Sequence, residues 1–242
     1  MSIKENINEL FDQIDNAALK ADRKLEDIKV IAVTKTISLD LIEQAIQAGI
    51  TDIGENRIQE AIPKIQALKE KYPNVTWHMI GHLQSNKIKQ AVENFDVIQS
   101  VDSLKLARGI GDQVIRGSGK GDQGIGGAGI KRILIEVNTS GEDAKYGVKP
   151  EETIQLLQNI STFGTLQVEG LMAVGPLTDD RDLVRMAFKK LKQLSDQIKN
   201  LNLPNVDMKY LSMGMSHDFE MAIEEGSNMV RIGSAIFGKR RR

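Results

Sequence analysis

Apolar residues follow two alternating spacings along this chain. Short and nearly continuous apolar runs, such as residues 28–35, are typical of buried β-strands, whereas apolar residues at every third or fourth position, as in residues 3–23, predict amphipathic helices. Predicted strands cover residues 28–35, 51–55, 75–81, 95–101, 131–138, 168–174, 209–215 and 228–237. Predicted helices cover residues 3–23, 38–49, 56–72, 150–162, 179–201 and 217–225, with two more beginning after residues 85 and 102.

Eight strands that alternate with helices indicate one parallel sheet covered by helices. Within 242 residues this number favours closure into a (β/α)8 TIM barrel over an open, doubly wound sheet. We therefore expect a single domain over residues 1–242. The helix at residues 3–23 precedes the first strand and is an extra element, which we expect outside or beneath the barrel.

A glycine-rich segment interrupts the regular pattern at residues 117–129, where seven of thirteen residues are glycine. It lacks the Gly-Lys-Ser/Thr ending of a P-loop, and it precedes a strand instead of following one. So many glycines leave the backbone without a preferred conformation. We expect a flexible surface loop on the side of the barrel opposite the active face.

Composition and charge exclude several classes of function. The formal net charge is −1, which gives no electrostatic footprint for nucleic acid or an anionic membrane. The chain has no cysteine and three histidines, so a disulfide framework and a thiol nucleophile are excluded and no metal site is expected. No run approaches the roughly 18 apolar residues of a membrane span. Together with the polar N-terminus, these features predict a cytoplasmic protein. We expect the basic C-terminal residues 239–242 to be a solvated tail.

Candidate chemistry collects at the predicted carboxyl ends of the strands, where barrel enzymes place their active groups. Lys35 ends the first strand, an unusual position for a charge within an apolar, β-branched run. Polar residues also end other strands, at positions 55–57, 81–84, 102, 138 and 172–176. We therefore treat Lys35 as a candidate functional amine at the mouth of the barrel.

The last two strands indicate an anion site. Residues 212–217 pass from strand seven into a helix through a glycine and small hydroxyl residues, and Arg231, Gly233 and Ser234 are placed on strand eight. Small residues and a helix N-terminus suit a phosphate group. The chain can thus offer an amine on one side of the mouth and a phosphate cup on the other.

An amine and a phosphate cup together suit pyridoxal 5′-phosphate (PLP), which has an aldehyde for a lysine Schiff base, a phosphate, and a ring nitrogen that needs a partner. Arg231 can donate a hydrogen bond to that nitrogen. Such a donor opposes protonation of the pyridine ring and weakens the electron sink that racemases and transaminases use. The arrangement predicts a firmly held cofactor with muted chemistry.

Motifs spread over nearly the whole chain resemble those of the pyridoxal phosphate homeostasis proteins of the YggS/PROSC type, at residues 33–35, 54–60, 77–87, 170–172, 211–216 and 231–238. The resemblance implies a barrel like the N-terminal domain of alanine racemase, with PLP bound covalently to Lys35. It further implies the remaining cofactor contacts: Ser216, Gly233 and Ser234 at the phosphate, Ser212 near it, Arg231 at the ring nitrogen, and Asn56 and Met213 along the ring.

The resemblance also implies a function. Members of that family are associated with vitamin B6 balance and have no established turnover. We therefore expect no catalytic residues and a protein that holds, buffers or delivers PLP, with PLP-dependent apo-enzymes as further partners. The glycine-rich segment is longer than the family pattern leads us to expect.

Two enzymatic functions remain as alternatives. A racemase-like enzyme needs a second acid/base group, which in alanine racemase is a tyrosine from an additional domain of the partner subunit. The chain ends soon after strand eight, so we expect that domain to be missing and the protein to be a monomer; Tyr146 is the nearest tyrosine candidate. A Schiff-base aldolase that uses Lys35 on a sugar phosphate is the other alternative.

Several polar and sulfur-containing residues near the mouth receive a structural interpretation. We expect His78 and His82 to be structural histidines and Glu142, Lys145 and Tyr146 to lie in a solvated loop. The methionines at positions 172 and 215 are expected to be packing residues.

Overall fold

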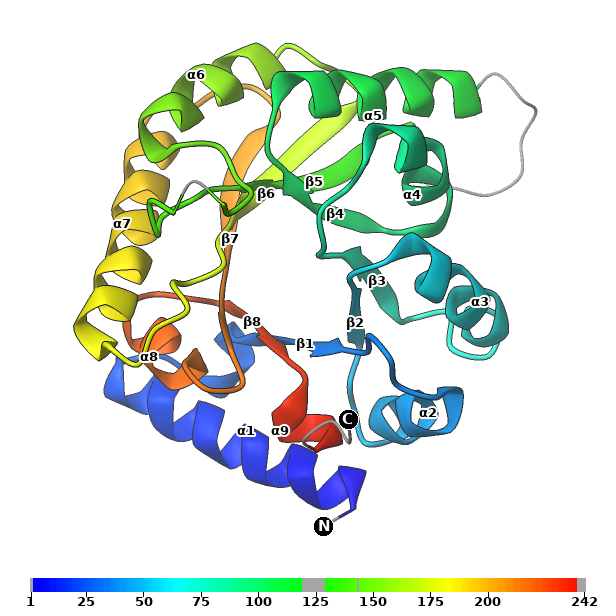
Figure 1. Ribbon diagram of the computed structural model, residues 1–242, viewed down its shortest axis with the longest axis vertical. Coiled ribbons are helices and arrows are strands. Elements are labelled where there is room, and N and C mark those ends of the chain that lie inside the picture. The colour runs from blue at the N-terminus through cyan, green and yellow to red at the C-terminus, as the bar shows by residue number, and fades with distance from the viewer. Residues whose placement is uncertain (1, 119–128, 143, 239–242) are drawn as a thin grey trace.

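Eight parallel strands close into a barrel in the computed structural model, which describes residues 2–118, 129–142 and 144–238 (Figure 1). The sequence prediction of a (β/α)8 barrel is confirmed. The strands are β1 (Lys29–Val33), β2 (Asp52–Glu55), β3 (Thr76–Met79), β4 (Val97–Val101), β5 (Lys131–Glu136), β6 (Leu166–Met172), β7 (Val206–Met215) and β8 (Met229–Ile232).

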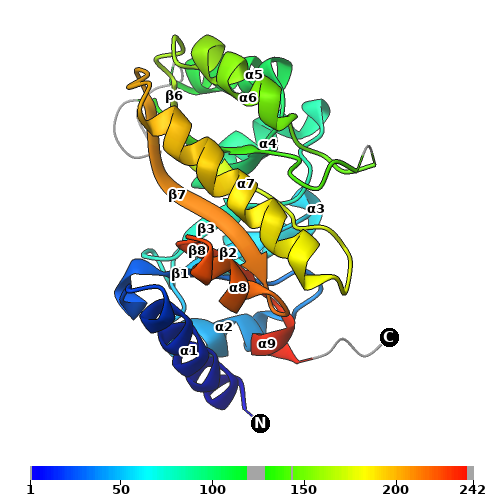
Figure 2. The same ribbon diagram turned by 90° about the vertical axis from the view of Figure 1, so that its left-hand side faces the viewer.

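Helices follow the strands and surround the barrel (Figure 1). They are α1 (Ile3–Lys20), α2 (Leu39–Gln47), α3 (Ile58–Leu68), α4 (Ile88–Asn94), α5 (Leu104–Ser118), α6 (Pro150–Ile160), α7 (Arg181–Lys199), α8 (Phe219–Glu224) and α9 (Ser234–Phe237). Two short 3₁₀ turns, Leu25–Asp27 and Ser85–Lys87, precede β1 and α4. Figure 2 shows α7 lying across the long strand β7.

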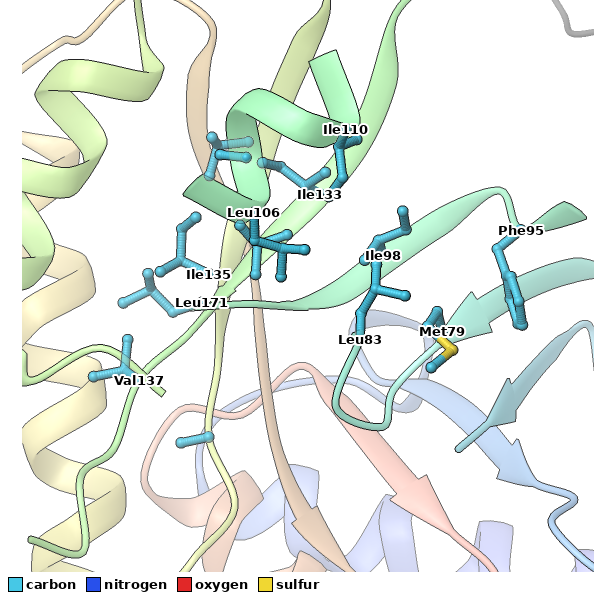
Figure 3. Close-up of a cluster of buried hydrophobic side chains, with 14 of the residues drawn as sticks. Met79, Leu83, Phe95, Ile98, Leu106, Ile110, Ile133, Ile135, Val137 and Leu171 are labelled. Atoms are coloured by element: carbon cyan, nitrogen blue, oxygen red, sulfur yellow. The ribbon is translucent and has the colours of Figure 1, made fainter. Parts of the chain in front are cut away.

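Both faces of most strands are buried, as in other helix-covered parallel sheets, although the first five residues of β7 are exposed or partly exposed. Inside the barrel, one apolar layer is contributed by five strands, through Ile31, Val97, Leu134, Met172 and Met229. The opposite face of the strands packs against the helices. Figure 3 shows part of this outer core between β3–β6 and the neighbouring helix α5, where Met79, Phe95, Ile98, Leu106 and Ile110 come together.

The N-terminal helix covers the seam where β8 meets β1. A capping box starts it, since the Ser2 hydroxyl accepts from the Glu5 N–H and the Glu5 carboxylate accepts from the Ser2 N–H. Its buried stripe, which includes Ile7 and Leu10, packs with Val30 of β1 and with residues of β8, α8 and α9. The extra helix therefore lies outside the barrel wall, one of its two predicted positions (Figure 1).

The chain leaves β8 earlier than predicted. The strand stops at Ile232, and Gly233, with φ −114° and ψ −73°, begins the short helix α9. The prediction of a strand over residues 228–237 is therefore wrong for its last residues. The physical reason is that the Gly233 and Ala235 N–H groups donate to the Ser216 hydroxyl and not to a neighbouring strand.

The predicted glycine-rich loop at residues 117–129 is described only at its ends. Gly117 and Ser118 belong to α5, so the helix continues two residues into the predicted loop. Residues 119–128 lie outside the described residues. Among the described residues, no helix combines the length and apolarity needed to cross a bilayer, and no cluster of three potential metal ligands occurs.

Candidate cofactor-binding site

Lys35 lies in a turn just beyond the end of β1, two residues after Val33, and its side chain is partly buried. The strand was predicted to continue to Lys35 itself. The next residue, Thr36, has a left-handed backbone with φ +64°. The lysine is thus carried by a tight turn at the mouth of the barrel and not by the strand.

A buried ion pair anchors the residue before Lys35. The hydroxyl of the fully buried Thr34 donates to the Glu55 carboxylate at 2.6 Å, and Lys64 Nζ of α3 donates to Glu55 at 2.7 Å and to the Thr34 carbonyl at 2.7 Å. Charge-assisted hydrogen bonds of this kind are shorter and stronger than neutral ones. They tie the start of the Lys35 turn to β2 and α3.

Backbone donors converge on the Ser216 hydroxyl between the ends of β7 and β8. Its oxygen accepts from the Gly233 N–H at 3.1 Å and from the Ala235 N–H at 3.3 Å. Ser234 is exposed beside them as the first residue of α9. Two N–H groups that already converge on one oxygen are the kind of donors that bind a phosphate oxygen. The three residues expected at the phosphate therefore lie together.

The turn that carries Ser216 depends on Gly214. This glycine has φ +95°, and a Cβ placed on it would lie 2.6 Å from Ala222 Cβ and 3.0 Å from Phe219 Cα. Only glycine fits both the backbone and the space. The Asp218 carboxylate closes the turn by accepting from the Met215 N–H. These contacts set the position of the Ser216 hydroxyl.

Arg231 is buried inside the barrel. Its Nη1 donates to the carbonyl and hydroxyl of Ser212 at 2.6 and 2.7 Å, and its Nη2 donates to the Ala173 carbonyl at 2.8 Å. Burial lowers the pKa of the Arg231 guanidinium to about 10, although the nearby carboxyl groups of Glu136 and Asp218 oppose the shift. These three hydrogen bonds fix the guanidinium against the ends of β6 and β7.

Ser212 and Met213 point to opposite faces of β7. Ser212 is fully buried in the barrel and lies between Arg231 and Gln99. The Met213 side chain belongs to the outer core with Leu211 and Ala222, so it faces the helices. The Met213 side chain therefore does not share the barrel interior with Ser212, because alternate residues of a strand face opposite sides, and a contact of Met213 with the ring stays a prediction.

Asn56 follows β2 at the mouth and carries a buried side-chain oxygen, Oδ1, that has no hydrogen-bond partner among the described residues. Gly81 allows the end of β3 to pack closely against the Asn56 backbone, since a Cβ on Gly81 would lie 2.3 Å from the Asn56 carbonyl oxygen. A buried acceptor without a partner is costly. A polar ligand at the mouth would satisfy it.

Glu136 is a polar residue of the mouth that the sequence analysis missed. It ends β5 on the same strand face as Leu134, which faces the barrel interior, and its Oε2 is buried without a hydrogen-bond partner among the described residues. Burial raises the pKa of the Glu136 carboxyl to about 7, with a further contribution from Asp102 and an opposing one from Arg231. A charged residue closing an apolar strand, the signal used for Lys35, would have found it.

The two histidines near the third strand have different surroundings. His78 is buried with both ring nitrogens hydrogen bonded, to Asp52 at 2.8 Å and to Gln99 at 3.0 Å, which confirms its structural interpretation. His82 stacks on Tyr146 with ring centroids 3.7 Å apart. The loop that contains Tyr146 is thereby held against the end of β3.

Closure of the barrel brings the expected site residues to one seam. Strands β1 and β8 are neighbours, with Ile31 paired to Arg231. Beyond the paired residues the two chains stay close, since a Cβ placed on Gly233 would lie 3.7 Å from Val33 Cβ. The expectation of an amine and a phosphate cup on opposite sides of the mouth is corrected, because the first and last strands of a closed sheet are adjacent. The unsatisfied Asn56 oxygen, the buried Arg231 guanidinium and the N–H groups that converge on Ser216 fit PLP, a ligand with polar groups around one ring.

Comparisons with known proteins agree with this geometry. Residues 10–241 match the family described as "Alanine racemase, N-terminal domain". The chain is 39% identical over 240 residues to the pyridoxal phosphate homeostasis protein of Haemophilus influenzae, covering 99% of this chain and 97% of that protein.

Two solved structures are similar to this chain over nearly its whole length. A protein of Bifidobacterium adolescentis described as unknown matches with a TM-score of 0.90 and 35% identity over 97% of this chain and 94% of that one. PipY of Synechococcus elongatus with PLP bound matches with a TM-score of 0.80 and 30% identity over 98% of this chain and 100% of that one. The chain belongs to the family of pyridoxal phosphate homeostasis proteins, and its barrel is of the alanine racemase N-terminal type.

Proposed function

We propose that this protein binds PLP at the β8–β1 seam and takes part in intracellular PLP homeostasis. The observation that carries the proposal is the juxtaposition of the Lys35 turn, the Ser216 donors and the buried Arg231 at one edge of the mouth. The homeostasis function named for the Haemophilus influenzae relative and the PLP bound to PipY support it.

Each residue of the site has a distinct task in this proposal. Lys35 supplies the amine that holds PLP as a Schiff base. Ser216, Gly233 and Ser234 bind the phosphate, Arg231 donates to the ring nitrogen, and Asn56 accepts from a polar group of the ring. Ser212 contributes by holding Arg231, and Met213 only by its place in the β7 backbone.

The same residues favour a protein that binds PLP without catalysing a reaction on it. Bound PLP supplies an aldehyde for the Schiff base and a ring that accepts electrons when its nitrogen is protonated. A guanidinium that donates to the ring nitrogen opposes that protonation. The protein would therefore retain and deliver the cofactor to PLP-dependent apo-enzymes, as a cytoplasmic monomer, without turning over amino acids.

Reconstitution with PLP tests the proposal. We expect the wild-type protein to become yellow, and borohydride reduction followed by peptide mass spectrometry to place the label on Lys35. Lys35→Ala should lose the coloured band, whereas Lys89→Ala, which alters an exposed lysine of α4, should keep it. A wild-type protein that stays colourless with excess PLP would refute the assignment.

Activity assays address the remaining alternative. We expect no sustained racemisation of alanine or serine by the PLP-loaded protein. Turnover at enzyme-like rates that disappears in Lys35→Ala would instead support the racemase-like function. Light scattering tests whether the protein is a monomer. Pull-down of PLP-dependent apo-enzymes, with and without PLP, tests whether the protein delivers the cofactor to them.

A further inference from the structure

A chain of buried polar side chains crosses the interior of the barrel and ends at Arg231. It consists of Asp52 on β2, His78 on β3, Gln99 on β4, Ser212 on β7 and Arg231 on β8, and we call it the lumenal polar chain. All five side chains are buried, with exposed fractions of 4% or less. Polar groups buried at this depth need partners, and each of these has them.

The hydrogen bonds of the chain run in one consistent direction. Arg231 Nη1 donates to Ser212 Oγ at 2.7 Å, and the Ser212 hydroxyl donates to Gln99 Oε1 at 2.7 Å. Gln99 Nε2 lies 3.0 Å from His78 Nδ1 and 3.3 Å from Met229 Sδ. This leaves Nδ1 as the acceptor, so that the His78 proton is on Nε2.

Asp52 anchors the far end. His78 Nε2 lies 2.8 Å from Asp52 Oδ1, and Lys29 Nζ donates to both Asp52 oxygens at 3.0 and 2.9 Å. Burial raises the pKa of the Asp52 carboxyl, but hydrogen bonds from His78 and Lys29 outweigh it and lower the pKa to about 2. The carboxylate is therefore an acceptor, which keeps the proton on His78 Nε2.

The amide of Gln99 is the link that sets the orientation of Ser212. Its oxygen accepts from the Ser212 hydroxyl because its nitrogen is committed to His78 Nδ1 and Met229 Sδ. With its proton directed to Gln99, the Ser212 oxygen presents its lone pairs to Arg231. Reversal of the amide would place an N–H group against the Ser212 hydroxyl proton and the amide oxygen against the unprotonated Nδ1 of His78.

We propose that Gln99 and His78 are positioning residues that hold the Arg231 guanidinium in place through the Ser212 hydroxyl. This inference rests on the proposed function, in which Arg231 faces the ring nitrogen of PLP. Neither residue need contact the cofactor. The side chains that support Arg231 through Ser212 would thus come from β3 and β4, across the barrel interior from β8.

Three measurements test the proposal, beginning with the unaltered protein. Nitrogen-15 NMR of the three histidines reads the position of each ring proton. We expect His78 to carry a proton on Nε2 and none on Nδ1, because Nε2 faces the Asp52 carboxylate and Nδ1 faces the Gln99 amide nitrogen. A proton on Nδ1 would overturn the direction of the chain, and this arm needs neither a variant nor PLP.

The second measurement removes the Gln99 link. We expect Gln99→Met to bind PLP about fivefold more weakly, equivalent to ~1 kcal/mol for one hydrogen bond, and to shift the absorption band of bound PLP. The matched control is Lys131→Met, which also puts methionine in place of a long buried polar side chain. In the wild-type protein Lys131 donates to the Val92 and Phe95 carbonyls, outside the barrel interior. The control substitution should lower the melting temperature and leave PLP affinity and the band unchanged.

The third measurement restores the acceptor. In Gln99→Glu the new carboxylate still accepts from Ser212, so PLP affinity should stay within about twofold of wild type. A folded Gln99→Met with wild-type affinity and band would overturn the positioning role alone. A wild-type protein that does not bind PLP would overturn the proposed function as well.

Discussion

The two sides of the barrel differ in what they bury. On the outer face of β3–β6 most buried groups are apolar side chains, such as Met79, Phe95 and Ile98, packed against helices (Figure 3). Near β8 and β1 the buried groups include Arg231, Ser212 and the Glu55–Lys64 ion pair. Apolar packing adds stability with little demand on orientation, whereas buried polar groups need defined partners. The first side stabilises the barrel, and the second gives the site its geometry.

Removing an aromatic ring from the apolar side should have the largest effect on stability. Phe95 is 2% exposed, so Phe95→Ala leaves a cavity and should lower the free energy of unfolding by about 3–5 kcal/mol. Urea denaturation measures the loss. Leu177→Ala, at a side chain that is 90% exposed, is the control and should change stability by no more than about 0.5 kcal/mol. Loss of PLP binding in the folded fraction of Phe95→Ala would contradict the division between the two sides.

Glu136, a buried carboxyl group at the end of β5, should make the stability of the protein sensitive to pH. Its folded pKa of about 7 exceeds the ordinary 4.5, so the folded protein keeps a proton that the unfolded chain loses as the pH rises. Stability should therefore fall between pH 4.5 and 7, by about 3 kcal/mol in total.

Substitution of Glu136 by glutamine tests that slope in the PLP-free protein. Glu136→Gln cannot ionise, so it should be more stable than wild type at pH 8 by up to about 3 kcal/mol and nearly equal to it at pH 4. Urea denaturation at both pH values gives the difference. An equal effect of the substitution at the two pH values would show that the carboxyl does not titrate as inferred.

A methyl group on Gly214 should have a smaller effect on stability and a specific effect on the site. Gly214→Ala forces a left-handed backbone on alanine and a clash with α8, for a loss of about 2 kcal/mol, and displaces Ser216. We expect PLP affinity to fall by more than about tenfold, as measured by fluorescence titration. Gly49→Ala is the control, because Gly49 has φ +104° with no atom within 4 Å of the added Cβ. Equal PLP affinity in the two variants would argue against the phosphate role of the Ser216 turn.

The local pattern of the chain was sufficient for the architecture. Apolar spacing predicted the eight strands and the extra helix, and the charge at Lys35 and the small residues at 212–217 marked two parts of the site. These features are local, since propensity, capping and turn chemistry act over a few residues. The ends of β8 and α5 were predicted wrongly. β8 ends early because the Gly233 N–H donates to Ser216, and α5 continues through residues 117–118 of the glycine-rich segment.

The inward or outward direction of each strand residue was decided only by the tertiary structure. In a parallel barrel both strand faces are buried, so hydrophobicity does not separate the interior from the helix-facing side. The sequence therefore did not show that the Met213 side chain packs in the outer core, and Gln99 and Glu136 were not noticed as polar residues of the interior. Closure also put β1 beside β8, which brought the turn that carries Lys35 to the same seam as Arg231. The sequence by itself determined the barrel and most residues of the candidate site, while strand register and closure decided how those residues meet.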